Sequence, residues 1–329
     1  LLWGPAAITY IPGYSIGSSL SIAPAPGGGW LAAWITARTE DPPQVAVLAR
    51  RLDPLTGPGE PVTLLDPALH SSPAVLAVAG SASRMLLVWT EKIGAGPDET
   101  STFRAFGRLL DSLGQPAGPA RDLGVAGIGR LAMFDLQASG YGQDRFFAAW
   151  NSKVSQTSPR SIGGLALNGD VPVGPPFVIR NSALDRASPL SLGVDRLGRA
   201  ILGWKEFTFT PPSASHSFFY RFSVSGAPLS DLEEVSALPG FRIGFPTAVS
   251  AAPDGHWIAV WPRVANADAP AGIDALLGLA VDGCIPETHA LCLTGNRFRA
   301  TASYHDHLGR DAVGYASPLT SARGTFWLF

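Results

Sequence analysis

The chain has 329 residues, of which 15% are charged and 46% hydrophobic, and its formal net charge is −2. This composition excludes a disordered, highly charged chain. The near-neutral balance argues against binding through a basic surface, so we expect no nucleic-acid partner. Glycine (37 residues) and proline (29 residues) are abundant, which suits a fold with many turns.

The N-terminal stretch is apolar, and its first charged residue is Arg38. Prolines interrupt this stretch, among them Pro5, Pro12 and Pro24, so we expect no membrane-spanning helix. The first residue is Leu rather than Met, which indicates a processed chain. We expect an exported protein in an extracellular, periplasmic or cell-surface location.

A short strand pattern that ends in an aromatic residue recurs along the chain. Its closing aromatics are Trp34, Trp89, Trp150, Trp204, Trp261 and Tyr315, at intervals of 55, 61, 54, 57 and 54 residues. A near-constant period of this size indicates a repeat architecture. We expect the rings to pack between neighbouring sheets rather than to stack on a ligand.

A second pattern follows each of the first five aromatics. It reads Leu-Asp-Pro-Leu-Thr-Gly-Pro at 52–58 and Leu-Asp-Ser-Leu-Gly-Gln-Pro at 110–116, and it weakens in the later repeats. Asp, Asn and Gly between two β-rich runs predict a hairpin turn. Each repeat therefore reads as four strands, with this turn between the third and the fourth.

Four strands per repeat predict an all-β fold, a single six-bladed β-propeller of antiparallel blades over residues 1–329. A β-sandwich is the rival, but it does not need six equal units. Residues 4–12 resemble 59–67, so we expect the N-terminal strand to complete the last blade and cover its edge. The predicted blades are 18–67, 68–126, 127–182, 183–238, 239–295, and 296–329 with 4–12.

The Trp-ended strands and Leu-Asp…Gly turns resemble those of six-bladed propellers in secreted bacterial proteins. The resemblance covers the whole chain. It is to an architecture and implies no catalytic signature.

Arginines recur where the first strand of a blade is expected to begin. Arg130, Arg186 and Arg242 are each 56 residues apart, and Arg299 aligns with Arg186. Guanidinium groups that converge at the channel mouth would attract a carboxylate, sulfate or phosphate. The alternative is that each pairs with a loop acid such as Asp185.

The loops after the second strands lie on the same face, where binding sites are common. Charged residues at their starts define an expected rim of a binding site: Glu91, Lys92, Lys153, Lys205, Glu206 and Arg263. The alternative for the three lysines is that they are simply hydrophilic residues at the starts of loops.

The two cysteines, Cys284 and Cys292, lie eight residues apart. We predict a local disulfide, with two buried free thiols as the alternative. A disulfide persists mainly in an oxidising compartment, so it supports export.

These features predict a non-catalytic binding or assembly module that holds a protein or glycan partner on the loop face. The alternative is a sialidase-like or other glycan-processing enzyme with an arginine-lined site at the channel mouth.

Asp135 is the one acid in a predicted first strand, whereas glycoside hydrolysis usually needs two carboxyl groups. We therefore predict no catalytic residue, no cofactor and no metal. His305-Asp306-His307 reads as a solvated turn rather than a metal site.

Overall fold

The computed structural model describes the residues 14–38, 45–65, 73–93, 101–128, 135–152, 160–182, 186–187, 190–207, 215–234, 248–251, 255–263, 272–279, 296–300, 320–322 and 325–327. The chain divides into two compact units, Leu1–Phe177 and Val178–Phe329. The described residues form strands and turns but no helix, so none of them provides an apolar helix long enough to cross a membrane.

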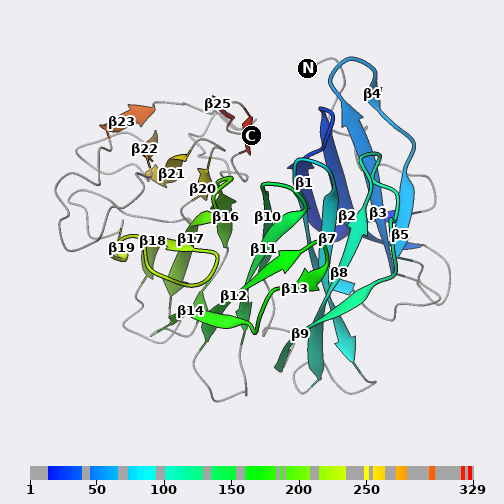
Figure 1. The fold of residues 1–329 in the computed structure, drawn as a ribbon, viewed down its shortest axis with the longest axis horizontal. Coiled ribbons are helices and arrows are strands. Elements are labelled where there is room, and N and C mark those ends of the chain that lie inside the picture. The colour runs from blue at the N-terminus through cyan, green and yellow to red at the C-terminus, as the bar shows by residue number, and fades with distance from the viewer. Residues whose placement is uncertain are drawn as a thin grey trace, which may run out of the picture. The chain divides into compact units, whose positions relative to one another are not determined.

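The first unit contains three antiparallel sheets (Figure 1). The first sheet has β1 (Tyr14–Pro24), β2 (Trp30–Arg38), β3 (Val45–Asp53) and β4 (Gly57–Pro58), with β5 (Val62–Leu65) paired to β3. The second has β6 (Pro73–Gly80), β7 (Met85–Ile93), β8 (Thr102–Leu110) and β9 (Arg121–Ile128). The third has β10 (Leu136–Tyr141), β11 (Arg145–Ser152), β12 (Ser161–Asn168) and β13 (Val171–Pro172). β14 (Phe177–Asn181), which pairs with β12, begins at the last residue of this unit.

The second unit repeats this pattern. Its first sheet has β15 (Arg186–Ala187), β17 (Arg199–Phe207), β18 (Ser215–Ser223) and β19 (Glu233–Glu234), with β16 (Ser191–Val194) paired to β17. Its second sheet has β20 (Ala248–Ala251), β21 (His256–Arg263), β22 (Gly272–Leu279) and β23 (Asn296–Ala300). A two-stranded ribbon follows, with β24 (Thr320–Ala322) and β25 (Thr325–Trp327).

The four closing tryptophans whose side chains the structure describes are core residues, as predicted. Trp34, Trp89, Trp150 and Trp204 are between 0% and 5% exposed. Trp89 packs with residues of the first sheet, and Trp150 packs with residues of the second. Burial of one large apolar side chain contributes about 2–3 kcal/mol, so the recurring rings hold neighbouring sheets together.

The first strands of successive sheets approach closely, because small residues line them. In the first unit β1 contacts β6 and β6 contacts β10. A Cβ atom on Gly80 would lie 1.9 Å from the carbonyl oxygen of Pro24, and one on Gly140 would lie 2.1 Å from the carbonyl oxygen of Gly80. The Val78 amide donates to the Ser21 hydroxyl across the same interface, at 3.0 Å. Side-by-side first strands of four-stranded antiparallel sheets are the arrangement of a β-propeller.

The Leu-Asp turns form where the sequence predicts them, between the third and fourth strands. Asp53 Oδ1 accepts hydrogen bonds from the Leu55 and Thr56 amides at 2.8 and 2.9 Å. Asp111 Oδ1 accepts equivalent bonds from the amides of Leu113 and Gln115. These bonds to the charged form lower the pKa of the Asp53 carboxyl below its ordinary value.

The last predicted repeat differs from the structure at Arg299. β23, which contains Arg299, pairs with β22 as the fourth strand of its sheet, in the register Asp274 to Arg299. The sequence alignment placed Arg299 in the first strand of the next blade. Alignment on one arginine does not distinguish a first strand from a fourth strand. Residues 4–12 lie outside the described part of the chain, so closure by the N-terminal strand stays a prediction.

Candidate functional site

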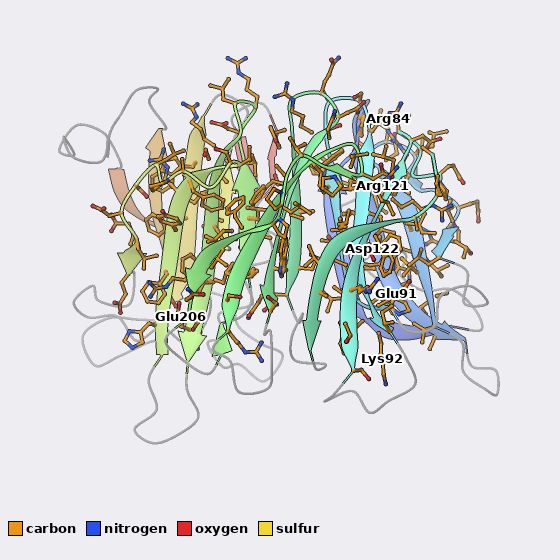
Figure 2. All side chains as sticks on the ribbon, turned by 60° about the horizontal axis from the view of Figure 1, so that its bottom comes forward. Arg84, Glu91, Lys92, Arg121, Asp122 and Glu206 are labelled. Atoms are coloured by element: carbon orange, nitrogen blue, oxygen red, sulfur yellow. The ribbon has the colours of Figure 1, made fainter. Side chains whose placement is uncertain are left out.

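Buried polar side chains gather at one end of the sheets. We call this the loop end: the end of a sheet at which its first strand begins and its second strand ends. In the first unit Figure 2 shows Glu91 and Lys92 near the end of β7 and Arg84 at the opposite end of the strand. The buried polar residues at the loop end of this unit include Thr90, Glu91, Asn151, Ser152 and Arg160.

Asp135 stands at the loop end of the third sheet, directly before β10. The Asn151 amide N–H donates to the Asp135 carbonyl at 3.0 Å, and Leu136 pairs with Trp150. Asp135 and Asn151 are therefore opposite each other, and opposite residues project from the same face of a sheet with Cβ atoms about 4.5–5.5 Å apart. The pair brings a carboxylate and an amide together at the entrance to a first strand.

The same face carries a buried arginine. Asn151 pairs with Ile162 of β12, and Arg160 lies two residues before Ile162, so strand alternation places all three on one face. Arg160 is only 4% exposed. Asp135, Asn151 and Arg160 thus form a polar cluster, which we call the Asp135 cluster.

Glu91 lies at the loop end of the second sheet and is 8% exposed. The indole N–H of Trp89 donates to Glu91 Oε1 at 2.7 Å. Trp89 and Glu91 are two residues apart on β7, so they share a face of the strand. The closing tryptophan therefore fixes one oxygen of this carboxylate.

The second unit contains the same Trp-x-Glu arrangement on β17. Trp204 donates its indole N–H to Glu206 Oε1 at 3.0 Å, and Glu206 is 2% exposed. Arg180 Nε lies 3.3 Å from the same oxygen. The guanidinium balances the buried carboxylate, so Glu206 belongs to a structural ion pair.

Two further ionisable residues, His216 on β18 and Lys205 on β17, lie next to Glu206 in the sheet. His216 Nδ1 lies 2.6 Å from Glu234 Oε1, and its ring stacks on Phe218. Burial lowers the pKa of the neighbouring Lys205 ammonium below its ordinary value, because desolvation disfavours the charged form.

The predicted site residues have different outcomes. The structure describes the side chains of four: Glu91, Lys92, Lys205 and Glu206. Of these, the two glutamates are buried and bonded to tryptophans. For Arg186, Arg263 and Arg299 the structure describes strand positions, and Arg186 begins β15 at the loop end as the alignment predicted. The predicted residues that lie outside the described part of the chain are Arg130, Arg242, Lys153, Cys284 and Cys292.

Sequence reasoning missed the burial of Asn151 and Arg160. Both are polar residues next to a predicted loop, and such residues are usually solvated. One signal was available for Asn151: it directly follows a closing tryptophan, at a position that is Ile35 in the first sheet and Thr90 in the second. The alternation of the Trp-ended strand buries that position as well.

Among the described residues, no group of three or more His, Cys, Asp or Glu side chains is placed to hold a metal ion. The histidines of His305-Asp306-His307 lie outside those residues.

No protein-family model and no curated protein matches this chain. Solved structures do match it. The α-L-arabinanase of Penicillium chrysogenum, complexed with arabinobiose, matches at a TM-score of 0.53 and 11% identity, over 86% of this chain and 83% of that one. An α-L-arabinofuranosidase of Fusarium graminearum, complexed with an iminosugar inhibitor, matches at a TM-score of 0.50 and 9% identity, over 83% and 79% of the two chains.

These matches correct the main functional prediction from the sequence. A non-catalytic binding or assembly module was predicted, but both matched structures are glycoside hydrolases, which supports the glycan-processing alternative instead. At 9–11% identity the likeness itself shows the fold, and the fold is an all-β propeller.

Proposed function

We propose that this protein is a glycan-processing enzyme that hydrolyses a glycosidic bond, with Asp135 as one of its reacting carboxyl groups. The observation that carries the proposal is the Asp135 cluster, in which a carboxylate at the entrance to a first strand lies on one sheet face with a buried amide and a buried arginine. A fold shared with two glycoside hydrolases supports it.

The chemistry of glycoside hydrolysis fits a carboxylate in this position. One carboxyl group protonates the leaving oxygen, and a second one acts as a base toward water or as a nucleophile toward the anomeric carbon. A base or nucleophile must be ionised, and Asp135 shares a sheet face with the positively charged Arg160. Asp135 therefore takes the second role.

Glu91 is the candidate for the acid. Among the acids that the structure describes in the first unit, Glu91 and Asp135 are the two at the loop end. Trp89 binds Oε1 of Glu91 and so orients its carboxyl group. Of the arginines that recur in the sequence, Arg130 precedes Asp135 by five residues, and its proposed role is to bind polar groups of the glycan.

The first substrates to test follow from the matched structures. Aryl α-L-arabinofuranosides and plant arabinan come first, followed by aryl glycosides of xylose, galactose, glucose and sialic acid. Asp135→Asn removes the ionisable group with almost no change of shape, and Asp122→Asn changes an exposed acid on β9 as a matched control.

We expect the parent chain to hydrolyse at least one substrate of this panel. Asp135→Asn is expected to lower kcat by about 1000-fold or more, and Glu91→Gln by about 100-fold on substrates with poor leaving groups. Asp122→Asn is expected to keep the parental rate. A parent without hydrolytic activity on the panel, or a fully active Asp135→Asn variant that melts like the parent, contradicts the proposal.

A further inference from the structure

The side chain of Asn151 is an unusual feature of the Asp135 cluster. It is 0% exposed, and neither Nδ2 nor Oδ1 forms a hydrogen bond with the part of the chain that the structure describes. A buried polar group without a hydrogen bond costs about 1–3 kcal/mol. Native proteins tolerate such groups mainly where a ligand, a water molecule or a functional requirement accounts for them.

The chemistry of the amide limits what it can bind. Oδ1 accepts hydrogen bonds and Nδ2 donates them, so the natural complement is a group that both donates and accepts. A hydroxyl group does both. A fully deprotonated anion such as sulfate offers no donor to Oδ1, and an ammonium group offers no acceptor to Nδ2.

The position of Asn151 shows where the hydroxyl would lie. Asn151 faces away from Trp150, because adjacent residues of β11 project to opposite faces, and on its own face it is directly opposite Asp135. A hydroxyl bound by this amide is therefore adjacent to the Asp135 carboxylate. We infer that Asn151 binds the hydroxyl group of a sugar or of the hydrolytic water and holds it beside Asp135.

This inference rests on the proposed function and makes it more specific. If the bound group is water, Asp135 takes a proton from the water molecule while the water oxygen forms a bond to the anomeric carbon. The glycosidic C–O bond breaks with its electron pair on the leaving oxygen, which takes a proton from the second carboxyl group. Direct attack by water inverts the anomeric configuration. If the bound group is a sugar hydroxyl, Asn151 contributes to affinity instead.

The test compares Asn151→Leu with Thr90→Val. Leu has nearly the shape of Asn but forms no hydrogen bond. Thr90 is the matched control, because it directly follows Trp89 as Asn151 follows Trp150, is 0% exposed, and its hydroxyl also forms no hydrogen bond within the described residues. Opposite Thr90 on the first strand lies Val75, so no acid faces the control position across this strand pair. Asn151→Ala serves as a second variant if the leucine is not accommodated.

Four quantities are measured for each variant: the melting temperature, kcat and KM on the substrate identified for the parent, and the thermal shift produced by L-arabinose, D-xylose, D-galactose and D-glucose. Asn151→Leu is expected to melt at or above the parental temperature, because it removes an unsatisfied buried amide. It is also expected to lose about 10- to 100-fold in kcat/KM or to lose the sugar-induced shift. Thr90→Val is expected to keep both functional properties.

The outcomes separate the possible ligands and the two proposals. A fall in kcat alone, with an inverted product anomer by NMR, identifies bound water, whereas a raised KM or a lost sugar shift identifies a sugar hydroxyl. A parent that hydrolyses glycosides while Asn151→Leu and Asn151→Ala keep its kcat/KM and sugar shift overturns this inference alone. A parent that binds a sugar through Asn151 without hydrolysing any glycoside overturns the proposed reaction alone. A parent that does neither overturns both.

Discussion

At the scale of single residues, the closing tryptophans carry much of the packing. Trp150 is 5% exposed and shares a core cluster with Phe146 of its own sheet and with Leu86 and Val88 of the second sheet. The Trp150 ring also restricts position 163 of the neighbouring strand to glycine, because a Cβ atom on Gly163 would lie 2.7 Å from the ring. The ring therefore connects two sheets and requires a glycine beside it.

Trp150→Ala is expected to lower the free energy of unfolding by about 3–5 kcal/mol, since it leaves a cavity between two sheets. Denaturant unfolding of the variant and the parent measures the difference. Leu113→Ala is the control, because Leu113 is 62% exposed and its truncation leaves no cavity. Equal stability of the Trp150 variant and the parent is incompatible with a packing role for the ring.

At the scale of elements, the sequence predicted turns and strands better than it predicted their polar ends. The Leu-Asp turns at Asp53 and Asp111 were predictable, because each carboxylate accepts hydrogen bonds from amides only a few residues away in the sequence. The pairing partner of β23 was not predictable, because the choice between two sheets depends on contacts between residues that lie far apart in the sequence. Nor does local sequence show that Asn151 and Asp135 lie opposite each other.

The Trp-x-Glu motif is a signal in the sequence from which the burial of two glutamates could have been predicted. Residues two apart on a strand share a face, so a glutamate two residues after a buried tryptophan is within reach of the indole N–H. Both Glu91 and Glu206 follow this rule. Sequence reasoning treated them as the first residues of a loop, where a charged side chain is normally exposed.

The turn at Asp53 predicts a pH dependence of stability. The folded-state pKa of Asp53 lies below its ordinary value of 3.8, so the ionised carboxylate stabilises the fold above that pH and loses this contribution as the pH falls below it. Asp53→Ala is therefore expected to melt below the parent at pH 7, with a difference that narrows below pH 3.8. Thermal melts from about pH 2.5 to about pH 7 check this, with Glu60→Ala, an exposed acid after the same turn, as control. A difference independent of pH contradicts the assignment.

At the scale of the whole molecule, the recurring aromatics and turns suffice to predict an all-β propeller, because a repeat period and a hairpin turn are both local features of the sequence. The number of blades and the closure by residues 4–12 stay predictions, as does the disulfide between Cys284 and Cys292, because these segments lie outside the described residues. Function was predicted less well. Fold alone does not determine it, and the acids and amides that bear on it come from different strands.

The predicted disulfide bears on where the protein works. Protein from its native source, denatured without reductant, is expected to show no thiol that reacts with a maleimide, since a bridge in an oxidising compartment consumes both cysteines. A reduced sample provides the control and is expected to show two reactive thiols. Two reactive thiols in the unreduced sample contradict the bridge and weaken the proposal of export.

The hydrolysis rate of one glycoside by the parent and by Asp135→Asn, prepared side by side, tests the central proposal most directly. The substrate is an aryl α-L-arabinofuranoside, or whichever aryl glycoside of the panel the parent cleaves fastest. The account predicts hydrolysis by the parent, a loss of about 1000-fold in the variant and equal melting temperatures. Equal hydrolysis rates for the two proteins, or no hydrolysis of any panel substrate by a folded parent, would contradict it.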